Sequence, residues 1–331
     1  MKAQHALILF ILLLLLCATS ASALQYSIVD LGEIRPRDIN DAGIIAGFDM
    51  FGLATWDYRT MQRTAIHDGF AGYHARINEQ NHVVASEGVW TPGFHAVSGG
   101  VGINDLSQVV GATDGYEQAF LWGNGTTTYL PSLTGGRWNF AVDISNSGLI
   151  VGGSEHAAVT WQNGTITPLP VPEGVLASSA IAVSDNGIIA GFGNRLYPHE
   201  EHMLVWIDGI VHDAEASIGS GLSSPTRATD VNNSGAVVGS TPLEDLDAVT
   251  DARIWMVSTG LLSLNTLIPQ GIGWSLNEAH AINNHGQIVG TGIIDNHRHG
   301  FLLNPVPEPS SVLALGSGLL ALGGLIRRRR R

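Results

Sequence analysis

The chain has 331 residues and a formal net charge of −13, with 29 acidic against 16 basic residues. Its one lysine and five of its arginines stand in the two terminal segments, so the part between them is more acidic still, with 10 basic and 28 acidic residues. Such a surface repels phosphate backbones, which argues against a nucleic-acid-binding protein. The one cysteine, Cys17, lies in the N-terminal apolar segment. Its removal with that segment would leave the mature chain without disulfides or thiolate chemistry.

Residues 1–23 have the composition of a secretory signal peptide. One lysine precedes an unbroken apolar run over residues 6–16, and A-S-A at 21–23 offers the small residues that signal peptidase requires. We therefore predict cleavage after residue 23. A retained membrane anchor is an alternative, but the apolar run is short for a transmembrane helix. A lipoprotein signal at Cys17 is a second alternative, although Leu16 occupies a position where lipoprotein signals have a small residue.

A ten-residue pattern, D-I-S-N-S-G-L-I-V-G at residues 143–152, recurs along the rest of the chain. Each copy places Asn or Ser and a polar cluster, in most copies ending in Gly, before a pair of aliphatic residues. Asn, Asp and Gly accept the backbone angles of tight turns, and β-branched pairs favour buried strands, so each copy predicts strand, turn and strand. The seven copies are 38–47, 76–86, 102–111, 143–152, 182–191, 230–239 and 281–290.

A second element follows each copy, as a short apolar strand that ends in Trp six times and in Leu once. These residues are Trp56, Trp90, Trp122, Trp161, Trp206, Trp255 and Leu303. A further turn and strand follow most of them, so one repeat supplies about four strands, the content of a propeller blade. Most repeat spacings are 38 to 51 residues, with one short step of 26 between Asn78 and Asn104. We predict an all-β propeller of about seven blades, or six if the short copy is not a separate blade.

The last repeat lacks its fourth strand, whereas residues 26–32 at the start of the chain resemble the strand that ends other repeats. We therefore predict that the N-terminal strand completes the last blade and removes an open sheet edge. The propeller domain is predicted to span residues 24–305.

The repeat resembles the HAF-type repeats of exported bacterial proteins. The resemblance rests on A-F-L-W at 119–122 and on the strand-turn pattern before it, and it covers nearly the whole mature chain. The His-Ala-Phe position itself is matched loosely, for example by His156, His202 and His299. The resemblance implies an extracellular repeat protein without a settled activity.

The C-terminal residues 306–331 are similar to a PEP-CTERM sorting signal. Pro307, Glu308 and Pro309 form the motif, residues 312–326 form an apolar segment, and Arg327, Arg328, Arg329, Arg330 and Arg331 form the basic end. The apolar segment predicts a transmembrane helix that the arginines orient toward the cytoplasm. The resemblance implies processing by exosortase in a Gram-negative bacterium that makes exopolysaccharide. An ordinary membrane helix after a Pro-rich linker is the alternative.

Three segments contain candidate ligands for a metal ion. P-H-E-E-H at 198–202 and N-H-R-H at 296–299 place two histidines close together, but His202 and His299 occupy a position that the repeat itself supplies. The acidic segment L-E-D-L-D at 243–247 could coordinate Ca²⁺, although a solvated loop is the favoured explanation. We therefore predict no catalytic, cofactor-binding or metal-binding residues, with Ca²⁺ as the one cofactor left open.

The sequence as a whole predicts an exported protein of the cell surface or extracellular matrix, tethered to the inner membrane until its tail is processed. Exosortase, signal peptidase and extracellular polysaccharide are the expected partners. We predict a structural or binding propeller without catalysis. A glycan-active hydrolase or lyase and a metal-dependent binding module are the alternatives. An enzyme would place carboxylates at channel positions that differ between repeats, whereas a binding protein would repeat its polar residues in many blades.

Overall fold

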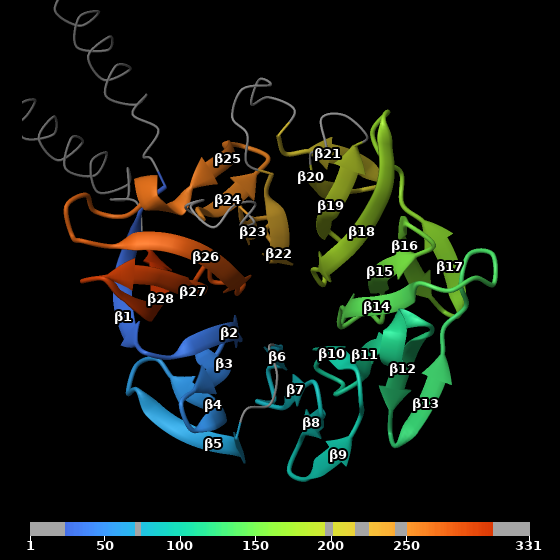
Figure 1. The fold of residues 1–331 in the computed structure, drawn as a ribbon, viewed down its shortest axis with the longest axis horizontal. Coiled ribbons are helices and arrows are strands. Elements are labelled where there is room, and N and C mark those ends of the chain that lie inside the picture. The colour runs from blue at the N-terminus through green and yellow to red at the C-terminus, as the bar shows by residue number, and fades with distance from the viewer. Residues whose placement is uncertain (1–23, 70–73, 196–200, 216–224, 242–249, 307–331) are drawn as a thin grey trace, which may run out of the picture. The chain divides into compact units, whose positions relative to one another are not determined.

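The computed structural model describes residues 24–69, 74–195, 201–215, 225–241 and 250–306. These residues form a β-propeller of seven four-stranded sheets arranged in a ring (Figure 1). The inner strands line the space at its centre, which is called here the channel. Two short 3-10 turns, η1 (Asp114–Tyr116) and η2 (Leu264–Thr266), are the only helical elements in the described part. The predicted all-β propeller is thereby confirmed.

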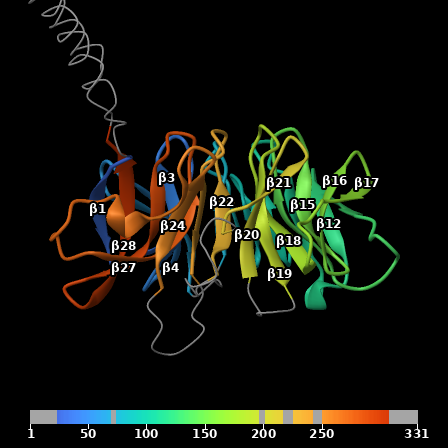
Figure 2. The same ribbon diagram turned by 90° about the horizontal axis from the view of Figure 1, so that it is seen from above.

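Each blade is named by its order along the chain, and its strands run from the channel outward. Blade 1 contains β2 (Arg35–Ile39), β3 (Ile44–Asp49), β4 (Gly52–Asp57) and β5 (Gln62–Asp68). Blade 2 contains β6 (Ala75–Ile77), β7 (Val83–Ala85), β8 (Gly88–Trp90) and β9 (Phe94–Ala96). Blade 3 contains β10 (Gly100–Ile103), β11 (Val109–Ala112), β12 (Ala119–Gly123) and β13 (Thr126–Tyr129), and blade 4 contains β14 (Asn139–Ile144), β15 (Ile150–Ser154), β16 (Ala157–Gln162) and β17 (Thr165–Pro168). Blade 5 contains β18 (Val175–Val183), β19 (Ile189–Arg195), β20 (Glu201–Ile207) and β21 (Ile210–Asp213). Blade 6 contains β22 (Arg227–Val231), β23 (Val237–Ser240), β24 (Ala252–Met256) and β25 (Gly260–Ser263). Blade 7 contains β26 (Ser275–Ile282), β27 (Ile288–Ile294), β28 (His297–Pro305) and β1 (Tyr26–Gly32). Figure 2 shows the blades from the side.

The short step between Asn78 and Asn104 is a complete blade of reduced size. All four strands of blade 2 are three residues long. Its turn takes the same left-handed backbone as the others, with Asn81 at φ 61° where blade 1 has Gly43 at φ 78°. Asn is one of the few residues besides Gly that adopt this conformation readily, so the turn survives without Gly. The count is therefore seven blades and not six.

The N-terminal strand closes the ring as predicted. Strand β1 lies next to β28 and is the outer strand of blade 7. Leu31 is its anchor, because the side chain is buried in a cluster that joins blades 7 and 1. Near the chain ends, the N–H of Val306 donates to the carbonyl of Gln25 over 2.9 Å. The first residues after the predicted signal peptide thus meet the start of the predicted tail.

The hydrophobic core is divided into layers between neighbouring blades. One cluster joins blades 3 and 4 around Trp161, and another joins blades 4 and 5 around Trp206. Both indole N–H groups also donate across a blade boundary, Trp161 to the carbonyl of Pro131 at 2.7 Å and Trp206 to that of Pro170 at 2.6 Å. Buried indoles need such an acceptor. In blades 4 and 5 the repeated Trp therefore holds the blade to the one before it.

The turn that precedes the second strand links each blade to the next through a closed ring of hydrogen bonds. The residue after the repeat Asn or Ser donates its backbone N–H to the side-chain oxygen of the equivalent residue one blade further on. The acceptors in order are Asp41, Glu79, Asp105, Asn146, Asp185, Asn233 and Asn284, with distances of 2.7 to 2.9 Å. The last bond, from Asn284 to Asp41, closes the circle. These residues satisfy main-chain donors that the turns leave unpaired.

The two predicted targeting segments, residues 1–23 and 307–331, lie outside the described residues. Within the described part, the structure contains no helix long and apolar enough to cross a membrane.

Candidate functional site

The inner strands of six blades carry an extra residue at the same repeat position, and these bulges shape the channel; β18 and β26 each contain a second bulge. The register of β2 with β3 shifts between Pro36 and Asp38, so that Arg37 is left outside the ladder. Bulges of this kind re-aim side chains. The bulge residues at the shared repeat position all line the channel and are Arg37, Val101, Val142, Ile181, Thr229 and His280.

The repeat Gly at the end of each turn pattern is explained by the same bulge. A Cβ on Gly152 would lie 2.0 Å from the carbonyl oxygen of Phe140 on the bulged strand. Blade 2 has no bulge, and Ala85 stands there in place of Gly. The bulge thus requires Gly on the neighbouring strand.

Four charged residues from four inner strands meet in the channel and are named here the channel plug: Arg76, Asp38, Asp143 and Asp230. Nη1 of Arg76 lies 3.7 Å from Asp38 and 3.6 Å from Asp230, and Nη2 donates to the carbonyl of Thr229 over 3.1 Å. Each Asp also accepts a backbone N–H from the following blade, namely those of Ile77, Val183 and Ile282. The plug therefore ties the inner strands together.

Burial dominates the electrostatics of the plug. It raises the pKa of Asp143 to about 6 and that of Asp230 to about 7, and it also raises the pKa of Asp38. The Arg76 guanidinium opposes these increases in all three cases. The carboxylates in turn raise the pKa of Arg76, although burial alone would lower it. One cation thus serves three buried carboxyl groups, which is a structural arrangement with little freedom to bind a substrate.

Arg76 stands between two cavities. On the side of the turns, a polar cavity of about 200 Å³ is lined by the turn residues of all seven blades. On the other side lies a cavity of about 960 Å³, lined by the bulge residues and by loops of blades 3 and 4. We call the larger one the channel cavity. Its volume suits a ligand of several rings.

One wall of the channel cavity is aromatic and comes from blades 3 to 5. It contains Tyr116, Trp138, Phe140 and Phe192. Trp138 and Tyr116 are 57% and 59% exposed, and the ring of Tyr116 packs edge-on against Phe140 at 5.6 Å. Both exposed residues have left-handed backbones, at φ 66° and 56°. Bulky residues pay an energetic penalty there, and such strain is concentrated at functional sites.

The wall formed by blades 7, 1 and 2 is polar. Arg37, His74 and His280 line it. Nε of Arg37 is buried without a hydrogen-bond partner, and so is Oγ of Ser179 elsewhere in the lining. Because buried polar groups are normally paired, these two atoms mark the cavity as a place for a polar ligand.

An apolar crevice of about 270 Å³ continues outward from the aromatic wall. It shares Trp138, Phe140 and Phe192 with the channel cavity. Oδ1 of Asn194 lines the crevice and is also buried without a partner. The two spaces therefore form one elongated surface around the same aromatic rings.

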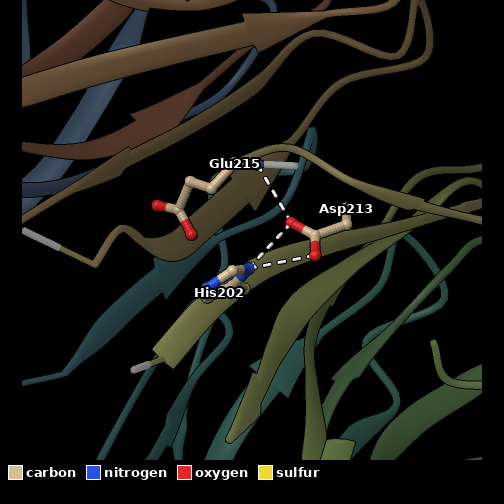
Figure 3. Close-up of side chains that lie close together, drawn as sticks. All are labelled: His202, Asp213 and Glu215. Carbon is tan, nitrogen blue, oxygen red and sulfur yellow. Dashed lines mark hydrogen bonds and ion pairs between the residues drawn. The ribbon is translucent and has the colours of Figure 1, made fainter. Parts of the chain in front are cut away.

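His202, Asp213 and Glu215 lie close together in blade 5 (Figure 3). None of the three lines the channel cavity. Nδ1 of His202 lies 3.0 Å from both carboxylate oxygens of Asp213. Sequence reasoning paired His202 with the histidine of P-H-E-E-H, but residues 196–200 lie outside the described part. The structure instead brings His202 to two acidic residues that follow it in the chain.

The three side chains of this cluster are already engaged. Asp213 also forms an ion pair with Arg195 at 2.9 Å, and the Glu215 carboxylate accepts the N–H groups of Met203 and Thr226. A guanidinium beside the ligands opposes cation binding. A similar pair occurs in blade 7, where Nδ1 of His299 lies 2.9 Å from Asp30. The pair is therefore a repeated link between the third and fourth strands, and these residues do not fit an open metal centre.

The remaining residues that the sequence singled out cannot be placed in the structure. The acidic segment 243–247, the sorting motif at Pro307, Glu308 and Pro309, and the arginines 327–331 lie outside the described residues. The structure adds the channel plug and the channel cavity, which sequence reasoning missed. One signal was present: Arg76 is the single basic residue at a repeat position where other copies have Asp, Gly or Ala.

Residues 305–331 match the PEP-CTERM protein-sorting motif. The chain carries an exosortase sorting signal. PEP-CTERM signals imply export, membrane anchoring and later processing by exosortase, so the match implies an exported, exosortase-sorted protein with a propeller fold. No curated protein matches the chain.

Solved structures share the fold at low sequence identity. The β-propeller domain of Cps50 (Swd1) from Myceliophteria thermophila has a TM-score of 0.54 and 13% identity, over 83% of this chain and 98% of that chain. The extracellular domain of a one-component system from B. thetaiotaomicron has a TM-score of 0.53 and 12% identity, over 85% of this chain and 40% of that chain. The present chain thus spans less than half the length of that protein. Both likenesses show the fold alone.

Proposed function

We propose that this exported protein is a non-catalytic saccharide-binding propeller of the cell surface or extracellular matrix, and that the channel cavity is its binding site. The aromatic wall carries the proposal. Exposed aromatic rings offer flat apolar faces on which the C–H groups of a sugar ring pack, and a few polar groups then fix its orientation. Trp138 and Tyr116 are held exposed at the cavity despite a strained backbone.

The elongated surface favours a polymer over a single sugar. Trp138, Phe140 and Phe192 face both the channel cavity and the adjoining crevice. A chain of sugar rings could therefore continue from one space into the other. This geometry supports extracellular polysaccharide as the partner, in agreement with the exopolysaccharide-producing host that the sorting signal implies.

The positions of the carboxylates favour binding over hydrolysis. Glycoside hydrolysis normally requires two carboxyl groups on either side of the scissile bond. Among the described residues that line the channel cavity, Asp114 is the single carboxylate. The three Asp residues of the channel plug occupy equivalent repeat positions and are bound to Arg76 or to backbone N–H groups.

Replacing Trp138 with Gly should separate binding from stability. Gly adopts the left-handed backbone of residue 138 without strain, so we expect the free energy of unfolding to stay unchanged or to increase by about 1 kcal/mol. Loss of the indole face should weaken oligosaccharide binding roughly tenfold. Glycan-array screening followed by calorimetric titration of the full-length protein in detergent would measure the second effect, and denaturant unfolding the first.

Tyr129→Ala is the matched control for this experiment. Tyr129 is also an exposed aromatic residue, at 56%, but it lies on outer strand β13 and lines neither cavity. Its removal should leave binding unchanged. Equal losses in both variants, or no loss in Trp138→Gly, would count against the channel cavity as the saccharide site.

We also propose the residues that act in sorting. Pro307, Glu308 and Pro309 form the processing motif, and Arg327–Arg331 hold the end of an apolar segment, residues 312–326, on the cytoplasmic side. We propose further that residues 1–23 are a signal peptide that directs export, and that the repeat is of the HAF type found in exported bacterial proteins.

Changing Pro307 and Glu308 to Ala should leave membrane insertion intact and block processing. Changing the five arginines to Gln should instead weaken orientation and retention, because the positive charges no longer favour the cytoplasmic side. Mass spectrometry of protein from the native host reports the C-terminus in each case. A wild-type protein that still ends at Arg331 would favour a permanent anchor over processing.

A further inference from the structure

We infer that the channel cavity selects a saccharide that bears carboxylate groups, such as a polyuronic acid, and that the Arg37 guanidinium binds the carboxylate while the aromatic wall contacts the sugar ring. The inference rests on the proposed saccharide-binding function and deepens it by naming the ligand class.

Arg37 is placed to receive an anion. It is the bulge residue of β2, which directs its side chain into the channel cavity. Its Nε is buried without a hydrogen-bond partner, and no hydrogen bond or ion pair among the described residues involves its guanidinium. A guanidinium remains protonated at neutral pH and presents paired N–H donors that match a carboxylate. The structure thus leaves a half-buried cation without a bonded anion.

The carboxylate that acts on Arg37 electrostatically, Glu278, forms no ion pair with it. Glu278 acts on Arg37 electrostatically but is bound to Arg298 at 2.5 Å and to the hydroxyl of Thr291 at 2.8 Å. The same Glu278 lies 3.5 Å from Nε2 of His280. All three contacts engage Oε2 of Glu278, and no ion pair joins Glu278 to Arg37 among the described residues, so an incoming carboxylate would meet Arg37 without displacing an existing ion pair.

The two histidines on the same wall are neutral at pH 7. Burial lowers the pKa of His280 to about 3, with a further contribution from Arg37, and burial lowers the pKa of His74. Neutral imidazoles both donate and accept hydrogen bonds, which suits sugar hydroxyl groups. Arg76 also faces the cavity, but its charge is opposed by three carboxyl groups. The available positive charge of the cavity therefore comes from Arg37.

The position of Arg37 relative to the aromatic rings suits an acidic sugar. Arg37 is in blade 1, and Phe140 and Phe192 are in blades 4 and 5, across a seven-bladed ring (Figure 1). A ligand between the walls would present a ring face to one side and its substituent to the other. Asp114, the carboxylate of the lining, lies next to Tyr116 in η1 and so belongs to the aromatic side.

The test compares acidic and neutral forms of the same ligands. Tetrasaccharides of galacturonate, mannuronate and glucuronate, each with its methyl ester, are titrated calorimetrically into the full-length protein in detergent. We expect at least one acid to bind about 10- to 100-fold more tightly than its ester, because charged hydrogen bonds to Arg are lost in the ester. Arg37→Gln should remove this preference and leave ester binding within about twofold. Arg37→Lys should retain part of it, since the charge stays and the paired donors do not.

Arg35→Gln is the matched control. Arg35 lies on the same strand and undergoes the same change of charge, but it is exposed and does not line the cavity. It should keep the preference for the acid. If every ester binds as tightly as its acid, the inference is overturned but saccharide binding stands. The same conclusion follows if Arg37→Gln weakens acid binding and ester binding equally. Failure of every acid and ester to bind would overturn the proposed function together with the inference.

Discussion

Replacing Arg76 with Met should lower the free energy of unfolding by about 3–5 kcal/mol at pH 8, the cost of leaving buried charges without their partner. Arg76 is the cation of the channel plug, within 3.7 Å of Asp38 and 3.6 Å of Asp230. Met keeps most of the side-chain volume, so the loss reports charge and hydrogen bonding more than packing. Denaturant unfolding at fixed pH measures the effect.

The same loss should shrink as the pH falls to 5. The folded-state pKa values of Asp143 and Asp230 are about 6 and about 7, above their ordinary value of 3.8. A raised carboxyl pKa means that the folded state holds a proton that the unfolded state has released. The contribution of such a carboxyl group to the free energy of unfolding is complete below pH ~4 and is lost as the pH rises through the folded-state pKa. Without Arg76 these pKa values rise further, so the free energy of unfolding of the variant is lowered most at high pH.

Arg137→Met provides the control for this prediction. Arg137 is 82% exposed and forms a 3.4 Å surface pair with Glu117. Surface pairs contribute about 0–1 kcal/mol, so this variant should be nearly neutral. A loss in Arg76→Met that stays the same from pH 5 to pH 8 would show that the plug carboxyl groups are not the source of the effect.

Replacing Leu31 with Ala should lower the free energy of unfolding by about 2–5 kcal/mol, as large-to-small changes at buried sites do. Leu31 is the anchor of the closing strand β1 and is buried against Ile39, Ile45 and Leu302 among others. For a domain of this size the melting temperature should fall by about 5–15 °C. Loosening β1 also exposes the edge of β28, so we expect aggregation on heating. Calorimetry with light scattering follows both effects.

Thr128→Ala is the surface control, on the outer strand of a blade that is closed by its own chain. Thr128 is exposed on β13, the outer strand of blade 3. We expect a change within about 0.5 kcal/mol there. If Leu31→Ala were equally mild, β1 would not be what holds the ring closed.

Sequence alone determined the strand order within a blade and the closing strand, and it left the blade count at six or seven, which the structure settled as seven. Each depends on a local pattern that repeats. Asn or Asp followed by Gly specifies a tight turn, and the paired β-branched residues after it specify a buried strand. Residues 26–32 could be assigned to the last blade because they match the strand that the last repeat lacks. Even the smallest blade was detectable, since Asn78 and Trp90 keep their places within it.

Only the tertiary structure decided which residues from different blades meet. The turn acceptors from Asp41 to Asn284 read in the sequence as turn formers, yet each binds the next blade across 26 to 51 residues, and the last bond crosses 243. Arg76 meets three carboxyl groups for the same reason, and Arg37 comes to face aromatic residues of blades 4 and 5. Turn and strand patterns report interactions over a few residues, whereas the channel is lined by residues from the inner strands of all seven blades. Ring closure therefore determines the composition of the channel cavity, and local sequence does not.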